Sequence, residues 1–223
     1  MCGRYTLRAT PQELAEFFEL TRAPELEDRP NICPTQSVLG ITLADDSNKR
    51  EARDFRWGLV PSWSRDPTGG AKMINARSET AAEKPAFRAA FKRRRCLIPA
   101  DGFYEWRKVA GQKKKQPCYV SVHDQPLIAF AGLWERWEKE NQDPLITCTI
   151  LTTSANSKIS AIHDRMPVIL HPETYDLWLA AGSDTEELKA LMQPYPSEEI
   201  DMSEDMADRL LSSGERGHQG SLF

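Results

Sequence analysis

Residues 95–109 read RCLIPADGFYEWRKV, and this stretch determines the fold class that we expect. Two runs rich in apolar and aromatic residues, 95–99 and 102–109, lie on either side of a short turn at Asp101. Short runs of this composition, bounded by turn residues, are typical of successive β-strands. We therefore interpret the stretch as two strands of one sheet.

Five further segments of the same kind lie on either side of this pair. The alternation in Tyr119-Val120-Ser121-Val122 and the β-branched residues in 146–150 both favour strands. Turn residues at 111–116 and 123–126 separate several of the segments at short spacing. This spacing predicts a mostly antiparallel sheet or barrel, with the remaining strands at 38–43, 51–57, 117–123, 127–134 and 145–153.

Helices are expected to be few and short. Thr10-Pro11-Gln12-Glu13 has the pattern of a capping box with proline at the first helical position. Other helices are predicted at 85–94, 156–163, 172–180 and 185–192. The sequence has no internal repeat and no long linker, so we expect one mixed α+β domain over residues 2–196.

Residues 197–223 differ in composition from the rest of the chain. They are first acidic and then rich in glycine and serine, with little core-forming content. We expect a divergent tail that forms a short peripheral helix and then a frayed end.

Composition excludes several classes of protein. The 223 residues include 40% hydrophobic residues and five scattered cysteines, which fits a folded cytoplasmic chain with reduced thiols. The longest uncharged apolar run, 127–134, is far shorter than the ~20 residues of a membrane span. No C-x-x-C pair, G-x-G-x-x-G motif or P-loop occurs. We therefore expect a monomer that contacts no membrane and holds neither metal nor cofactor.

Charge is distributed unevenly along the chain. The net charge is −4, but residues 92–115 hold nine basic residues against two acidic ones, and residues 184–209 hold nine acidic against two basic. A local basic surface can bind a phosphate backbone even in an acidic protein. A solvated surface is the simpler alternative.

Cys2 becomes a reactive position if Met1 is removed. The new terminus then carries an α-amine with a pKa of about 7.7–8.0 beside a thiol with a pKa near 8.5. The amine can condense with an aldehyde to an imine, and the tethered thiol can then close a five-membered thiazolidine ring. The alternative is that Cys2 is an ordinary second residue without a chemical role.

Six segments, in order from residue 2 to about residue 170, resemble signature segments of one family. This is the SRAP family, the SOS-response-associated peptidase domain proteins that process abasic sites in single-stranded DNA. The segments are Cys2-Gly3-Arg4-Tyr5, 31–36 (NICPTQ), 57–63 (WGLVPSW), 74–80 (INARSET), 94–106 (RRCLIPADGFYEW) and 162–167 (IHDRMP). Residues 198–223 lack the family's Pro-Val-Ser and Val-Asn motif, so the resemblance does not extend to the family's last strand.

The resemblance implies a set of reacting groups. Cys2 attacks the ring-opened deoxyribose aldehyde of an abasic site and forms a thiazolidine crosslink to DNA. Asn75 orients the amine and aldehyde, Glu105 moves protons, and His163 acts on the deoxyribose hydroxyl and on reversal. Taken singly, Asn75 could be a turn residue, Glu105 a partner of Arg107, and His163 the end of a helix.

The resemblance also implies a DNA-binding surface. Arg4, Arg77 and Arg165 are expected to hold phosphates, and Thr152 is expected to lie near the DNA backbone. Trp63 matches an aromatic that wedges against bases, which fits single-stranded DNA or a single-strand/duplex junction.

Three functions remain open from the sequence. The first is an abasic-site sensor that crosslinks to single-stranded DNA and shields the lesion, with a β-elimination (lyase) side activity available from the same imine. The second is an N-terminal-cysteine peptidase or autopeptidase, in which the terminal amine activates the thiol. The third is a protein that binds single strands without a covalent bond.

Overall fold

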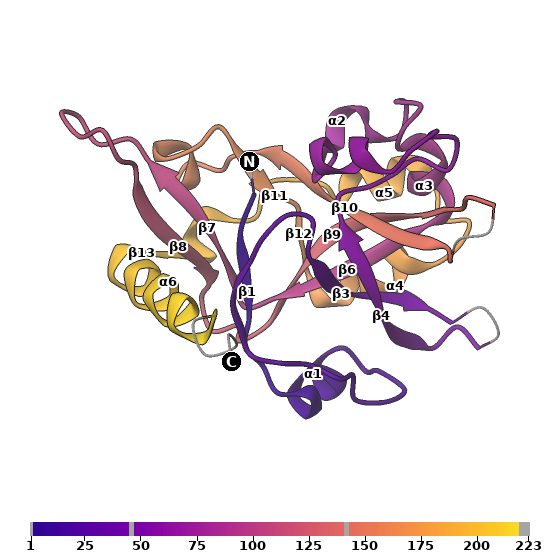
Figure 1. Cartoon of the computed structure of the whole chain (residues 1–223), viewed down its shortest axis with the longest axis horizontal. Coiled ribbons are helices and arrows are strands. Elements are labelled where there is room, and N and C mark those ends of the chain that lie inside the picture. Colours follow the sequence, from indigo (N-terminus) through magenta and orange to yellow (C-terminus); the bar gives the residue numbers. More distant parts are fainter. Residues whose placement is uncertain (1, 45–46, 141–142, 219–223) are drawn as a thin grey trace.

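The computed structural model describes residues 2–44, 47–140 and 143–218, and two β-sheets dominate it (Figure 1). The five-stranded sheet has the order β13 (Ile200–Ser203), β8 (Gln116–Val122), β7 (Gly102–Arg107), β1 (Tyr5–Leu7) and β2 (Arg29–Ile32). The eight-stranded sheet has the order β11 (Arg165–Pro167), β10 (Leu145–Ser154), β4 (Arg50–Trp57), β3 (Ser37–Leu43), β6 (Arg95–Ala100), β9 (Ile128–Trp137) and β12 (Ile169–Leu170), with β5 (Asn75–Arg77) paired to β10.

The expected fold class is confirmed. Each of the seven strands predicted from sequence is present within three residues at either end, and most pairings are antiparallel. The parallel pairings join β10 to β4 and β5. The helices are short, apart from the last: α1 (Pro11–Phe17), α2 (Ser78–Ala81), α3 (Arg88–Arg93), α4 (Tyr175–Leu179), α5 (Thr185–Ala190) and α6 (Glu204–His218), with 3₁₀ turns η1 (Thr68–Lys72), η2 (Ile159–Ala161), η3 (Pro172–Thr174) and η4 (Ser197–Glu199).

Aromatic side chains join the two sheets across a common core. Tyr5 of β1 is fully buried, with its ring 5.4 Å from the Trp57 ring of β4 and 5.8 Å from the Phe130 ring of β9. Phe103 of β7 reaches the same Phe130 ring at 5.9 Å. Edge-to-face contacts of this kind add to the hydrophobic gain of burying the rings, so they fix the small sheet against the large one.

The predicted capping box is confirmed at the start of α1. The Thr10 hydroxyl accepts from the Glu13 backbone N–H (3.3 Å), and the Glu13 carboxylate accepts from the Thr10 backbone N–H (2.8 Å). Both bonds satisfy donors that the first turn of a helix otherwise leaves unpaired. The buried Leu14 then holds the helix against the core.

The predicted helix at 156–163 is wrong. Only the short turn η2 forms there. Asn156 holds the start of this turn, because its Oδ1 atom accepts from Ile159 N–H (2.9 Å) while its Nδ2 donates to Tyr195 C=O (2.7 Å). The turn ends because the chain then enters β11, which pairs with β10. The helix expected at 172–180 is likewise divided into η3 and α4.

After Pro196 the expected helix is present as α6, but a strand that was not expected, β13, precedes it, and the expected frayed end lies outside the described residues. Strand β13 pairs with β8 along four residue pairs and forms one edge of the five-stranded sheet. Helix α6 then covers that sheet, with Ala207 and Leu210 buried against Tyr104 and Tyr119. The division of the chain at residue 196 stays a prediction, and residues 219–223 lie outside the described residues.

No helix among the described residues is long and apolar enough to cross a membrane.

Candidate active site where the two sheets meet

Cys2 lies just before β1, next to β7. Its side chain is fully buried. Tyr5 pairs with Phe103, and Tyr104 N–H donates to Arg4 C=O at 2.9 Å. Because these strands are antiparallel, the same register brings Glu105 opposite the residue that follows Cys2. The negative charge of Glu105 also acts on the Cys2 thiol, so the two groups lie close together.

Asn75 reaches Cys2 from the other sheet. It begins β5, which runs parallel to β10, and its Nδ2 donates to Cys2 C=O at 2.8 Å. The Asn75 Oδ1 atom is buried and has no hydrogen-bond partner within the described part of the chain. A buried acceptor without a partner is costly, so the site offers a free acceptor next to Cys2.

The surroundings of Cys2 keep its thiol protonated. Burial raises the pKa of the Cys2 thiol well above its usual range, and the negative charge of Glu105 raises it further. The hydrogen bond from the Arg4 backbone lowers this pKa, but to a smaller extent. Glu105 itself is only 3% exposed. A carboxylate in such a place can accept a proton from a neighbouring group without competition from bulk water.

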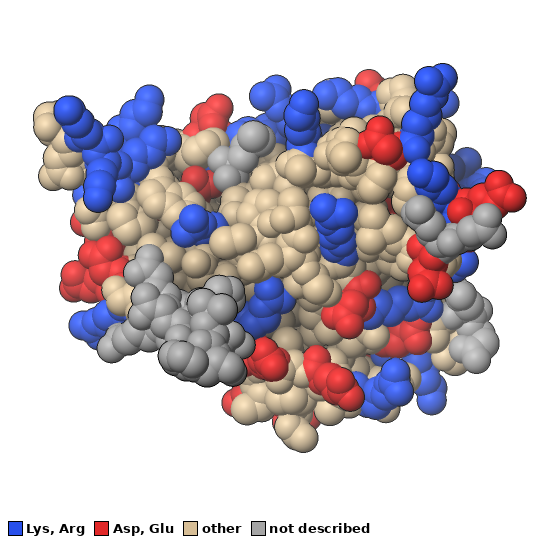
Figure 2. Space-filling view, viewed as in Figure 1, with Lys and Arg blue, Asp and Glu red and all other residues tan. Residues whose placement is uncertain are grey.

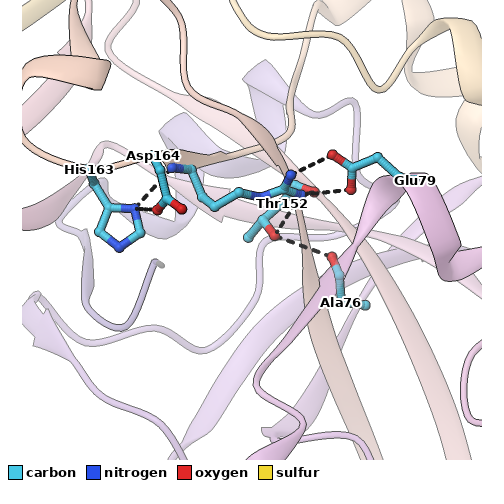
Figure 3. Close-up of polar contacts among 6 residues, drawn as sticks. Ala76, Glu79, Thr152, His163 and Asp164 are labelled. Atoms are coloured by element: carbon cyan, nitrogen blue, oxygen red, sulfur yellow. Dashed lines mark hydrogen bonds and ion pairs between the residues drawn. The ribbon is translucent and has the colours of Figure 1, made fainter.

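His163 lies on the loop between η2 and β11. Its Nδ1 accepts from the Arg165 backbone N–H at 2.9 Å. The Asp164 carboxylate lies 2.9 Å from the same Nδ1 (Figure 3). Contacts at Nδ1 therefore fix the orientation of the His163 ring.

Strand β10 brings the predicted DNA-binding residues of β5 and β11 together. Arg77 pairs with Thr152 on one side of β10, and Arg165 pairs with Ser154 on the other. Arg77 is exposed, whereas the Arg165 guanidinium is bound by both oxygens of Glu79 and by Thr152 C=O (Figure 3).

Thr152 lies beneath Arg165 and not on the surface. It is 1% exposed, its hydroxyl donates to Ala76 C=O at 3.5 Å, and Arg165 Nη2 lies 3.4 Å from the same oxygen. In this position the residue supports the Arg165 guanidinium. That Thr152 lies near a DNA backbone stays a prediction.

Trp63 is exposed and Arg4 is half-buried. Trp63 is 67% exposed, and its loop is anchored where Trp137 Nε1–H donates to Ser64 C=O at 2.8 Å. The Arg4 guanidinium lies 5.4 Å from the centre of the Trp106 ring. A large aromatic held out to solvent on an anchored loop suits stacking against a base.

Basic side chains line the edge of the molecule that also holds the N-terminus. Figure 2 shows lysine and arginine from the tip of the β7–β8 hairpin across to α2 and α3, and Figure 1 places the N-terminus between these regions. Not every arginine of the basic run belongs to this surface. Arg95 is buried and donates to Trp178, Phe91 and Ala180 carbonyls, and Arg94 pairs with Glu135.

Sequence reasoning missed Glu79 and Asp164, although both lie inside the segments quoted for the resemblance. Their proximity to Arg165 and His163 depends on strand pairing, which the order of residues alone does not show. Over the ranges that the structure describes, no group of three or more His, Cys, Asp or Glu side chains could hold a metal ion. Met1 lies outside those ranges, so its loss stays a prediction.

Fold and site together define an α+β domain in which a buried cysteine near the chain start lies between two sheets, beside a basic surface. The model of the family described as "SOS response associated peptidase (SRAP)" matches residues 1–206, and the chain belongs to that family. The expected family resemblance is thereby confirmed.

Relatives and solved structures agree with this assignment. The chain is 44% identical over 205 residues to the abasic site processing protein YoqW of Bacillus subtilis, covering 90% of each chain. It is 37% identical over 172 residues to the abasic site processing protein HMCES of Gallus gallus, covering 67% of this chain and 51% of that one. A crystal structure of a Bacteroides thetaiotaomicron protein superposes with a TM-score of 0.80 at 29% identity, covering 90% of each chain.

Proposed function

We propose that this protein captures abasic sites in single-stranded DNA by forming a covalent bond through Cys2. One observation carries the proposal: Asn75 binds the main chain of Cys2 and leaves a buried acceptor beside it. Once Met1 is removed, that acceptor can receive a hydrogen bond from the new terminal amine. The names of the relatives support an abasic-site-related role.

The reaction balances with the groups at the site. The Cys2 amine adds to the aldehyde carbon C1′ of the open sugar, and the resulting carbinolamine loses water to give an imine. The thiol sulfur then adds to the imine carbon while its proton passes to the nitrogen, which closes a thiazolidine. One water leaves in total, and Glu105 is placed to carry the protons between sulfur, nitrogen and departing oxygen.

The chemistry of ring closure sets the order of the steps, because the sulfur can attack an imine carbon only after the amine has formed the imine. A protonated thiol is a weak nucleophile, whereas a terminal amine with a pKa of about 7.7–8.0 is partly neutral at physiological pH. The amine therefore attacks first. A peptidase would instead need the thiol as nucleophile, with the terminal amine as its base.

The surrounding residues fit a DNA strand that passes over the site. Arg4, Arg77 and Arg165 are placed to hold phosphates, and the exposed Trp63 is placed to stack on an unpaired base. His163, next to Arg165 in sequence, is the residue proposed to act on the sugar hydroxyl and on reversal. An imine that escapes ring closure can undergo β-elimination, so a weak lyase activity accompanies slow closure.

The test uses a single-stranded oligonucleotide with one abasic site. Wild type is expected to give a band shift that survives denaturation, and Cys2→Ala none. Cys2→Ser, like Cys2→Ala, keeps the terminal amine but has no sulfur to close the ring, so the imine of either variant is expected to survive denaturation only after borohydride reduction. Cys33→Ser changes a half-buried cysteine that takes part in no step of the reaction, so it is the matched control and is expected to crosslink normally.

Two measurements complete the test. Intact mass shows whether Met1 has been removed, and a variant that retains Met1 is expected to form no stable adduct. Equal retention of intact and abasic DNA in high salt and detergent, or a Cys2→Ala variant that still crosslinks without borohydride reduction, would refute the proposal.

A further inference from the structure

The Arg165 guanidinium is already occupied by an anion of the protein itself. Both oxygens of Glu79 bind it, with Glu79 Oε2 at 2.9 Å from Nη2, and Thr152 C=O accepts from the same Nη2 (Figure 3). This two-point contact is the geometry in which an arginine binds a phosphate.

Few guanidinium donors remain for a DNA phosphate. A guanidinium has five N–H groups. The two N–H groups on Nη2 donate to Glu79 and to Thr152 C=O, and one N–H group on Nη1 donates to Glu79. The Nε–H is buried and lacks a hydrogen-bond partner among the described residues. A phosphate can therefore make a two-point contact with the outer edge of Arg165 only after Glu79 leaves it.

Glu79 is the partner that is free to move. The Arg165 side chain is 13% exposed and is held from beneath by Thr152, whereas the Glu79 side chain is 52% exposed in the first turn of α2. The hydrogen bond from Arg165 lowers the pKa of Glu79, so the carboxylate is ionised at neutral pH. An ionised carboxylate and a phosphate compete for the same edge of the guanidinium.

We propose that Glu79 is a phosphate mimic that occupies Arg165 in the free protein and is displaced by a backbone phosphate when DNA binds. The inference rests on the proposed function, because it needs a DNA strand running over Arg165. Glu79 keeps the guanidinium oriented before binding and lowers the affinity for every nucleic acid. It is a positioning residue that acts through Arg165 and does not touch the reacting atoms.

The primary test is the dissociation constant for an intact single strand at fixed salt. Glu79→Gln is expected to bind about five-fold tighter than wild type, since a neutral amide competes less well with phosphate. Glu138→Gln is the matched control: its carboxylate pairs with Arg136 on β9, so it reports the general effect of losing one negative charge. In an Arg165→Gln background, Glu79→Gln is expected to change affinity no more than Glu138→Gln does.

A kinetic readout separates positioning from a merely structural role. With an abasic oligonucleotide, Glu79→Gln is expected to lower the DNA concentration at half-maximal crosslinking rate and to leave the rate at saturation unchanged. Melting temperatures of all variants confirm that the fold is retained.

Two failures are distinguishable. If wild type binds and crosslinks DNA but Glu79→Gln binds no tighter than Glu138→Gln, the role of Glu79 is overturned and the proposed function stands. If wild type neither binds nor crosslinks single strands, the proposed function is overturned, and this inference with it.

Discussion

The two sheets contribute different things to the site. The five-stranded sheet is assembled from the beginning, middle and end of the described chain, and it carries Cys2 and Glu105. The eight-stranded sheet is built around the long strands β9 and β10, and it carries Asn75, Arg77 and Arg165. In the proposed function the small sheet thus supplies the reacting groups, together with Arg4, and the large sheet supplies the other groups that hold DNA and substrate.

The difference implies that chemistry and binding can be separated by mutation. The sheets are linked at the site by the hydrogen bond from Asn75 to Cys2 and below it by the contacts of Tyr5 with Trp57 and Phe130. A change on the small sheet should affect the rate of crosslinking. A change on the large sheet should affect affinity or alignment.

The largest effect is expected from ending the chain at Pro196. The truncation removes β13 and α6, and with them the buried Ile200, Ala207 and Leu210. Burial of one Ile or Leu side chain stabilises by about 2 kcal/mol, so the free energy of unfolding should fall by about 4 kcal/mol. Urea denaturation measures the loss.

Leu210→Ala in the full chain removes only one of these buried side chains. It should lower the free energy of unfolding by about 2 kcal/mol. A truncated chain as stable as the full one would instead support a domain that ends at residue 196.

The second-largest effect is a loss of crosslinking rate, which we expect from Glu105→Gln on the small sheet. Without its proton carrier, the crosslinking rate should fall about 100-fold, while the affinity for intact single strands stays within about two-fold of wild type, because no phosphate contact changes. Single-turnover kinetics at saturating DNA measures the rate. Glu204→Gln, at an exposed ion pair with Arg107, is the control and should crosslink normally. A parallel loss of rate and affinity would mean that Glu105 only supports the fold.

Replacing Asn75, on the large sheet, should lower the crosslinking rate by less than Glu105→Gln does. Asn75→Ala removes the buried hydrogen bond to Cys2, and a loss of this kind corresponds to about 1.4 kcal/mol, or about ten-fold in rate. Asn75→Asp keeps the acceptor Oδ1 but cannot donate to the Cys2 carbonyl. If the free acceptor matters more than the donor, Asn75→Asp should crosslink faster than Asn75→Ala. If Asn75→Asp crosslinks no faster than Asn75→Ala, the loss of rate comes from the hydrogen bond that Asn75 Nδ2 donates to Cys2 C=O.

The sequence predicted those parts of the molecule that local pattern determines. Strands such as β7 and β9 are long apolar runs bounded by turns, and the capping box at Thr10 needs only four residues. The motif segments also identified Cys2 and Asn75, which the structure brings into contact across 73 positions of sequence.

Other features depend on contacts that no local pattern records. Strand β13 is only four residues long, and two of them, Asp201 and Ser203, are polar, so its identity comes from pairing with β8. Thr152 is buried because β5 and β11 flank β10 at that point, and Glu79 meets Arg165 for the same reason. Only the paired strands show that one arginine already has an anionic partner.

The smallest effect concerns the edge of the small sheet, where His123 joins β8 to β13. His123 Nδ1 lies 3.1 Å from the Asp201 carboxylate, and Nε2 lies 3.2 Å from Asp124. The hydrogen bond with Asp201, and then the charges of Asp124 and Asp201, raise the pKa of His123. A pKa that is raised on folding means that the charged ring stabilises the folded state. This stabilisation is complete below the unfolded pKa of about 6.5 and is lost as pH rises through the folded pKa.

His123→Gln should therefore lose stability relative to wild type at pH 6 and match it more closely at pH 8, as measured by urea midpoints at low salt. Asp201→Asn should flatten the pH dependence in the same way. The effect is small because the ring is exposed and salt screens the pair. A wild-type chain that gains stability over His123→Gln between pH 6 and pH 8 would contradict the assignment, and β13 would then be held by its backbone pairing and its buried side chains alone.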